Sequence, residues 1–139
     1  MNINQNDLRL KLEIQKFGCY LLCLHYYIET HNKNLRFNTF DINDNYHKFV
    51  NLGYIKNNCF ILNPCRILAH YGIKSDVRWE YKNYVSKSNE FEVSEVKLDK
   101  AFGSHFIATN NSEVLYDSLK LKEKGTPYQV TSKRIFRKY

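Results

Sequence analysis

The sequence GCYLLCLHYYIETH, at residues 18–31, is apolar on nearly every side when it is wound as a helix. A helix that is apolar all round belongs in the middle of a domain rather than on its surface. The segment begins with Gly18 and Cys19, so a cysteine stands at its N-terminal end. We therefore predict a central buried helix with Cys19 in its first turn.

Two further helices are predicted in the first half of the chain. Thr39 or Asp41 can cap a helix that stops at Gly53. Residues 63–72 (NPCRILAHYG) have clearer boundaries, with asparagine at the N-cap, proline at the first helical position and glycine just past the end. Three helices are thus expected before the pattern changes.

The second half of the chain alternates between apolar and polar residues, as strands do. Strands are predicted at residues 77–81, 91–96, 104–109 and 113–117, with room for another at 128–136. The sequence NNS at 110–112 is a strong hairpin signal, and we place Trp79 in the core. Helices followed by an antiparallel sheet make an α+β domain.

The length and charge are those of one globular domain. The chain has 139 residues, 43% of them hydrophobic and 25% charged, and a formal net charge of +7. We assign residues 1–139 to a single domain, with an N-terminal arm at 1–14 and a basic tail at 133–139. The cations are otherwise scattered and no nucleic-acid-binding motif accompanies them, so we do not expect a nucleic-acid partner.

The expected location is the cytoplasm, where the cysteines are reduced. The N-terminus has neither a basic start nor an apolar run, and no stretch approaches the ~18 apolar residues of a membrane span. Cys19, Cys23, Cys59 and Cys65 lack the paired spacing of a zinc site. We expect no cofactor and no metal.

Cys19 is the first candidate for chemistry. Free N–H groups and the dipole at a helix N-terminus favour a thiolate, and Gly18 leaves the sulfur uncrowded. The Cys19 N–H is also placed to bind an oxyanion formed by attack at that sulfur. Taken alone, however, a cysteine in an apolar helix is usually a small core residue.

The hairpin supplies the second and third candidates, His105 and Asp117. If residues 109 and 113 close a three-residue loop, His105 lies directly across from Asp117 on the same face. A carboxylate there would orient the imidazole and stabilise its charged form. A slip of one residue would turn Asp117 to the other face, and the alternative is an exposed histidine beside a surface acid.

A glutamine upstream of the cysteine is the fourth candidate. Gln15 could supply a side-chain amide to the same oxyanion, and Gln5 is the poorer choice. We therefore expect Gln15 to act with Cys19, His105 and Asp117.

The order of these motifs resembles the papain-like cysteine peptidase superfamily. The chain reads Gly-Cys and a buried helix, an Asn-Pro helix ending in Tyr-Gly, then Ser-His-Phe-Ile and Tyr-Asp. It looks most like the small peptidase C39-like domains of bacterial and phage-borne proteins. Residues 15–31 match the nucleophile helix, 39–72 the following helices, and 104–117 the strands that carry the histidine and the acid.

This resemblance implies a papain-like α+β fold, with the helical half packed on a C-terminal antiparallel sheet. It implies Cys19 as nucleophile, His105 as general base and acid, Asp117 as orienting residue and Gln15 as oxyanion-hole donor. The chain departs from the pattern because that glutamine usually lies slightly further upstream. Ser118 also stands where a proline is frequent.

Two functions of different classes follow. The first is a thiol-dependent hydrolase, a cysteine peptidase or amidase that acts on a peptide or another amide. The second is a catalytically silent binding or interaction protein of a phage or plasmid system, built on the same scaffold. A third hypothesis, nucleic-acid binding through the basic tail, predicts salt-dependent affinity that is lost when residues 133–139 are removed.

Overall fold

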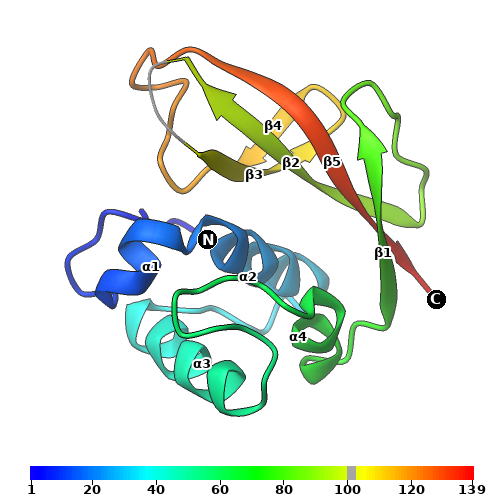
Figure 1. The fold of residues 1–139 in the computed structure, drawn as a ribbon. Helices are drawn as coiled ribbons and strands as arrows, with labels where there is room; N and C mark the ends of the chain where they lie inside the picture. Colours follow the sequence, from blue (N-terminus) through cyan, green and yellow to red (C-terminus); the bar gives the residue numbers. More distant parts are fainter. Residues whose placement is uncertain (100–102) are drawn as a thin grey trace.

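The chain folds into a layer of helices packed against a five-stranded antiparallel sheet (Figure 1). The structure is a computed structural model and describes residues 1–99 and 103–139. The helices are α1 (Leu12–Phe17), α2 (Cys19–His31), α3 (Thr39–Asn51) and α4 (Pro64–His70). The strands are β1 (Ser75–Tyr81), β2 (Glu90–Leu98), β3 (Ser104–Asn110), β4 (Glu113–Tyr116) and β5 (Tyr128–Lys138). The α+β class is therefore as predicted.

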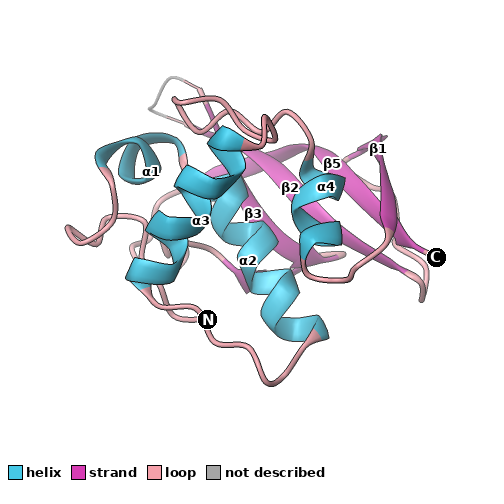
Figure 2. Cartoon of the chain, turned by 90° about the horizontal axis from the view of Figure 1, so that it is seen from below, coloured by secondary structure: helices cyan, strands magenta, loops and turns pink. Residues whose placement is uncertain are grey.

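Helix α2 is the centre of the molecule. Figure 2 shows it between α3 and the sheet, and Leu22, Leu24 and Ile28 are completely buried. Its Tyr27 hydroxyl donates to the backbone oxygens of Glu92 on β2 and of Thr109 on β3, at 2.5 and 3.1 Å. The buried helix of residues 18–31 is confirmed.

The boundaries of α3 and α4 follow from local side-chain caps. Asn38 caps α3 by accepting from the Asp41 N–H at 2.9 Å, and Asp41 accepts in return from the Asn38 N–H. This capping box places the cap one residue before the predicted Thr39. Asn63 caps α4 by accepting from the Arg66 N–H at 3.2 Å, as predicted.

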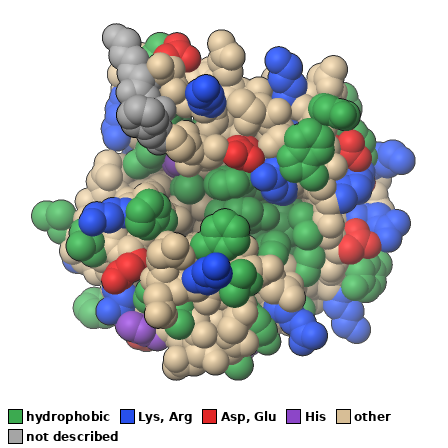
Figure 3. Space-filling model, in the orientation of Figure 1, with side chains coloured by type: hydrophobic (Ala, Val, Ile, Leu, Met, Phe, Trp, Pro, Cys, Tyr) green, Lys and Arg blue, Asp and Glu red, His purple; other side chains and the backbone are tan. Residues whose placement is uncertain are grey.

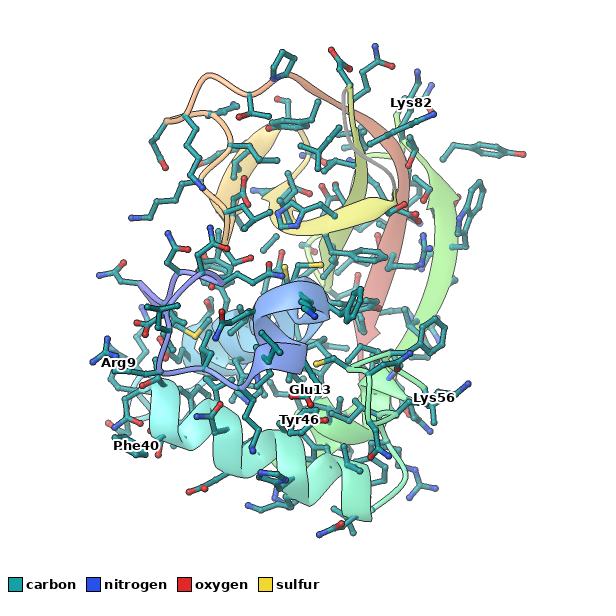
Figure 4. The ribbon with its side chains drawn as sticks, turned by 60° about the vertical axis from the view of Figure 1, so that its left-hand side comes forward. Arg9, Glu13, Phe40, Tyr46, Lys56 and Lys82 are labelled. Atoms are coloured by element: carbon teal, nitrogen blue, oxygen red, sulfur yellow. The ribbon has the colours of Figure 1, made fainter. Side chains whose placement is uncertain are left out.

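The N-terminal segment contains a helix that the sequence analysis misses. Helix α1 begins inside the predicted arm of residues 1–14, and its Ile14 is completely buried. Figure 4 shows side chains of α1 and α3 meeting where Glu13 and Tyr46 lie close together, while Phe40 points outward from α3. The predicted arm is therefore part of the packed helical layer.

The sheet has the order β1-β5-β2-β3-β4. Phe91 and Val93 of β2 are buried towards the helices, together with Phe136 of β5. The register shift between β2 and β5 leaves one extra residue on β5 and none on β2. The apolar pattern of β2 steps by three residues because Val96 faces away from Val93 and packs in a second cluster with Ile107 and Leu121.

The prediction of a basic tail at residues 133–139 is wrong. These residues continue β5, which pairs with β1 on one side and β2 on the other. Lys133 is buried and its Nζ lies 3.0 Å from the Glu92 carboxylate, while Arg134 lies 2.8 Å from that of Glu95. Removing this segment would therefore remove part of an internal strand, so the proposed truncation does not test nucleic-acid binding.

The placement of Trp79 in the core is also wrong. Trp79 is 52% exposed and Tyr81 70% exposed, because β1 lies at the edge of the sheet and the helical layer does not cover these two side chains. Among the helices of the described chain, none has the length and hydropathy needed to cross a membrane.

Candidate functional site

Cys19 is the first residue of α2 and lines a cleft of about 660 Å³. The cleft lies between the helical layer and the sheet, and His105 contributes to its wall. The Cys19 residue is 7% exposed. The structure thus brings the predicted nucleophile and the predicted histidine to one cavity.

Gly18 interrupts the helix between α1 and α2, so Cys19 becomes the first residue of a new helix. A Cβ atom on Gly18 would lie 2.5 Å from both the Cγ2 atom and the carbonyl oxygen of Ile14, which is impossible without movement. No side chain of the described residues caps the new helix. Among residues 1–99 and 103–139, no acceptor is bonded to the Cys19 N–H, so this donor points to a free position beside the sulfur.

His105 on β3 forms a hydrogen bond with Asp117. His105 Nε2 lies 2.7 Å from the Oδ1 atom of Asp117. The carboxylate also accepts from the backbone N–H groups of Leu119 and Leu121, at 2.9 and 3.0 Å. Three donors therefore fix the orientation of this carboxylate.

The predicted hairpin register is wrong although the predicted pair meets. Asn110 pairs with Glu113 around a two-residue turn, and a register shift follows between Ala108 and Thr109. Strand β4 ends at Tyr116, so Asp117 does not lie in the ladder. It reaches His105 from the turn after the strand, a position that the alternation of strand residues does not describe.

The electrostatics of the pair favour a charged imidazole. Burial lowers the pKa of His105, but hydrogen bonding to Asp117 and the interaction with Cys19 outweigh it and raise the pKa to about 9. Burial raises the pKa of Asp117, but the hydrogen bonds from His105, Leu121 and Leu119 outweigh this and lower it below its ordinary value. The pair can therefore hold an imidazolium against a carboxylate at neutral pH.

Of the two glutamines, the structure places Gln5 and not the predicted Gln15 in the wall of the cleft. The Gln15 side-chain amide donates to the Leu10 carbonyl at 2.8 Å, and Gln15 is not among the described residues that line the cleft. Gln5 is buried and lines the cleft. Its Nε2 donates to the Gln15 carbonyl at 3.0 Å, the carbonyl that Cys19 N–H would bind if α1 and α2 were continuous. The Gln5 amide therefore lies near the head of α2.

Residues 1–138 match the model of a protein family described as "Protein of unknown function, DUF261". The chain belongs to the DUF261 family. The match includes all four candidate residues of this DUF261 chain as well as Gln5. Comparison with curated proteins and with solved structures finds no match.

The other cysteines of this DUF261 chain lie in environments that disfavour a thiolate. Burial raises the pKa of Cys23 well above its ordinary value, raises that of Cys59 to about 12, and raises that of Cys65. The Cys23 Sγ donates to the Phe106 carbonyl at 3.5 Å, beneath the site as expected. Among the described residues, no cluster of three metal-ligating side chains is present.

The buried histidine of α2 is a satisfied core residue. His25 Nδ1 donates to the Leu21 carbonyl at 2.8 Å, and Nε2 accepts from Asn45 Nδ2 at 3.0 Å. Burial lowers the His25 pKa to about 4, so the ring is neutral. This environment gives His25 a structural role.

The walls of the cleft are largely apolar. Figure 3 shows hydrophobic side chains gathered in a hollow between the helical layer and the sheet, with Lys and Arg side chains at its margin. Phe17, Phe60 and Trp79 line it and are 59%, 61% and 52% exposed. They come from α1, from the loop before α4 and from β1, so no local pattern could have grouped them.

Proposed function

We propose that this chain is a thiol-dependent hydrolase of the cysteine peptidase or amidase type. Cys19 is the nucleophile, His105 the general base and acid, and Asp117 the residue that orients His105. The observation that carries the proposal is the 2.7 Å hydrogen bond between His105 and Asp117, in a cleft that Cys19 and His105 line together. A cysteine helix packed on a sheet that bears the histidine is similar to papain-like peptidases and their small C39-like members.

The geometry of His105 assigns a role to each ring nitrogen. Nε2 donates its proton to Asp117, so Nδ1 is left for the thiol of Cys19. The three hydrogen bonds to Asp117 keep the carboxylate charged and hold the imidazole in this tautomer. His105 can therefore hold the Cys19 proton on Nδ1, and release it, without changing its orientation.

Acylation begins with the Cys19 proton already held on His105 Nδ1, and the thiolate attacks the carbonyl carbon of an amide. A sulfur–carbon bond forms and the carbonyl electron pair moves to oxygen. The oxyanion then collapses, the carbon–nitrogen bond breaks, and His105 gives the proton to the leaving amine. The product is a thioester on Cys19.

Deacylation returns the enzyme to its starting state. His105 takes a proton from water, the hydroxide attacks the thioester carbon, and the carbon–sulfur bond breaks. The proton stays on His105 beside the Cys19 thiolate, and a carboxylic acid leaves. An amine in the place of water would give acyl transfer by the same steps.

Two donors are proposed for the oxyanion. The Cys19 N–H has no acceptor within the described chain, and Gln5 Nε2 uses one of its two hydrogens on Gln15. Gln5 thus replaces Gln15 in the proposed site. Their convergence on the head of α2 supports a preorganised oxyanion hole.

Acylation by p-nitrophenyl acetate tests the proposal without knowledge of the natural substrate. We expect a burst of p-nitrophenol and an acetyl group on Cys19 in the mass spectrum of the wild-type protein. The Cys19→Ser and His105→Ala variants should lose the burst, because their acylation rates should fall by on the order of 10²-fold or more. Equal acetylation of wild type and His105→Ala, or acetylation at another cysteine, would overturn the proposal.

A silent binding protein on the same scaffold is the second candidate. The apolar cleft with three exposed aromatic side chains supports it, because such a wall binds ligands without chemistry. In that case Cys19→Ser should leave ligand binding unchanged, and the wild-type protein should show no burst.

A further inference from the structure

Among residues 1–99 and 103–139, no strand pairs with one of the two edges of β1. Its other edge pairs with β5, with Asp76 opposite Arg137 and Arg78 opposite Ile135. Just beyond the strand, the Tyr139 N–H donates to the Lys74 carbonyl at 3.1 Å. This bond fixes which residues of β1 face β5.

Alternate residues of an antiparallel strand direct their N–H and C=O groups to the same neighbour. Because the backbone groups of Lys74 point to β5, those of Asp76 and Arg78 also point to it. Val77 and Trp79 must then direct their backbone groups to the free edge. Within the described chain, no backbone group is bonded to either of them on that side.

The free edge of β1 borders the cleft. Val77, Arg78 and Trp79 all line it, in company with Cys19 and His105. Successive side chains of a strand point to opposite faces, so three consecutive residues can line one cavity only where it meets the edge of the strand. The unpaired backbone groups therefore lie at the border of the cavity that holds the thiol.

The chemistry of the wall indicates the kind of ligand. Phe17, Phe60 and Trp79 offer exposed apolar surface for bulky side chains. The described lining residues include Lys16, Arg78 and Arg134 but no carboxylate. Arg78 and Arg134 are each paired with glutamates from outside the cleft wall, whereas Lys16 has no ion pair within the described chain. A cationic ligand would therefore be disfavoured.

We propose that the free edge of β1 binds an extended polypeptide segment by β-augmentation and directs it into the cleft towards Cys19. The segment carries bulky apolar side chains and is neutral or acidic. Its backbone forms hydrogen bonds with the backbone groups of Val77 and Trp79, and these bonds supply the affinity. The aromatic side chains of the cleft select which side chains the segment carries. This inference rests on the proposed function for the fate of the segment at Cys19, but the pairing itself needs no catalysis.

A peptide selection with the Cys19→Ala protein is the first half of the test. Random octapeptides on beads are selected for binding, and each selected sequence is resynthesised with one N-methyl group at successive positions. A methyl on an amide that faces β1 should weaken binding by about tenfold or more, because it removes a hydrogen bond and blocks the approach. A methyl on the next amide should change affinity less than about threefold.

The second half of the test measures amide hydrogen exchange in the protein. In the free protein, the Val77 and Trp79 amides should exchange rapidly, while that of Arg78 is protected by β5. Addition of a selected peptide should slow exchange at Val77 and Trp79 by about tenfold or more. Arg78 is the internal control and should not change.

Two matched pairs of variants complete the design. Val77→Pro removes an outward N–H without touching the β5 ladder and should weaken peptide binding, whereas Val77→Ala keeps that N–H. Lys16→Glu should reduce the preference for acidic over basic peptides. Lys82→Glu, at a side chain that points away from the molecule beyond β1 (Figure 4), should not.

The outcomes separate this inference from the proposed function. Selection of no peptide, selection of cationic peptides, or an N-methyl scan without alternation overturns the inference, even if p-nitrophenyl acetate acylates Cys19. Alternation with protection of Val77 and Trp79 upholds it, even if the wild-type protein cleaves nothing. In that case the proposed hydrolase fails alone.

Discussion

Cys19 differs from the other cysteines through one backbone feature, the interruption of the helix at Gly18. The interruption places Cys19 at a free helix N-terminus, whereas Cys23 and Cys59 are enclosed by apolar groups that raise their pKa values. A buried thiol with a pKa of about 12 presents very little thiolate near neutral pH. Cys19 should therefore differ from Cys23 and Cys59 in its reactivity towards thiol reagents.

Alkylation by iodoacetamide at pH 7.5 should modify Cys19 faster than Cys59 by about tenfold or more. The His105→Ala variant should lower the rate at Cys19, because the proposed partner of its thiol proton is gone, and should leave the rate at Cys59 unchanged. Peptide mass mapping over time gives both rates in one sample. Equal rates at the two cysteines, or no effect of His105→Ala, would contradict the catalytic assignment.

The raised pKa of His105 predicts a pH dependence of stability. The folded pKa of about 9 lies above the ordinary value of 6.5, so the folded state binds the proton more tightly than the unfolded state. The stabilisation is fully present below about pH 6.5 and is lost as the pH rises through about 9. The free energy of unfolding in urea should fall over this window by on the order of 3 kcal/mol.

The variants His105→Asn and Asp117→Asn serve as controls for this titration. His105→Asn should abolish the fall between pH 6.5 and 9, and Asp117→Asn should reduce it, because the imidazolium loses its main partner. A wild-type profile that is flat in this range would show that the pair is not held as an ion pair.

At the scale of elements, a buried ion pair links the side chains of β5 and β2. Lys133 Nζ lies 3.0 Å from the Glu92 carboxylate, and Glu92 also accepts from Thr109 Oγ1 and the Asn111 N–H. Lys133→Met should lower the free energy of unfolding by about 3–5 kcal/mol, because Glu92 would remain buried without its countercharge. The same substitution at Lys138, which is exposed on the same strand, should change it by less than about 0.5 kcal/mol. Urea unfolding measures both, and equal losses would refute a special role for the pair.

The same strand shows what the sequence could and could not predict. The limits of α4 were predictable because Asn63, Pro64 and Gly72 act within a few residues of the helix they bound. The burial of Lys133 was not, because Glu92 lies 41 positions earlier in the chain. From sequence alone, a run of cations without a nearby acidic residue is interpreted as an exposed tail.

The candidate site also combines features that the local sequence predicts with features that depend on distant contacts. Cys19 at a helix start follows from local signals, whereas the meeting of His105 with Asp117 was predicted from a hairpin register that the structure does not have. The observed register does not follow from local signals, because the Asn111 N–H donates to Glu92 at 2.7 Å and the Asn111 side chain accepts from the Ser86 N–H at 3.1 Å. These contacts with other parts of the sheet accompany the two-residue turn, and nothing in residues 104–117 encodes them.

At the scale of the whole molecule, the N-terminal residues connect the two layers that carry the site. Gln5 bonds to the helical layer at the Gln15 carbonyl, 3.0 Å away, and to Ser118 after β4 through its backbone and side chain, at 2.9 and 2.8 Å. Since Cys19 belongs to one layer and Asp117 to the other, this link helps to set their relative position. Gln5 therefore has a structural role and, as proposed, a role at the oxyanion.

The two roles of Gln5 can be separated with Ser118→Ala. Both Gln5→Ala and Ser118→Ala remove the side-chain hydrogen bond of this link, and each should lower the free energy of unfolding by about 1–3 kcal/mol. Only Gln5→Ala removes the amide beside Cys19, so it should slow acylation by p-nitrophenyl acetate by on the order of 10²-fold, with little change in Cys19 alkylation by iodoacetamide, which forms no oxyanion. If the two variants slow acylation equally, Gln5 acts only by holding the layers together, and the Cys19 N–H is the sole protein donor left to the proposed oxyanion hole.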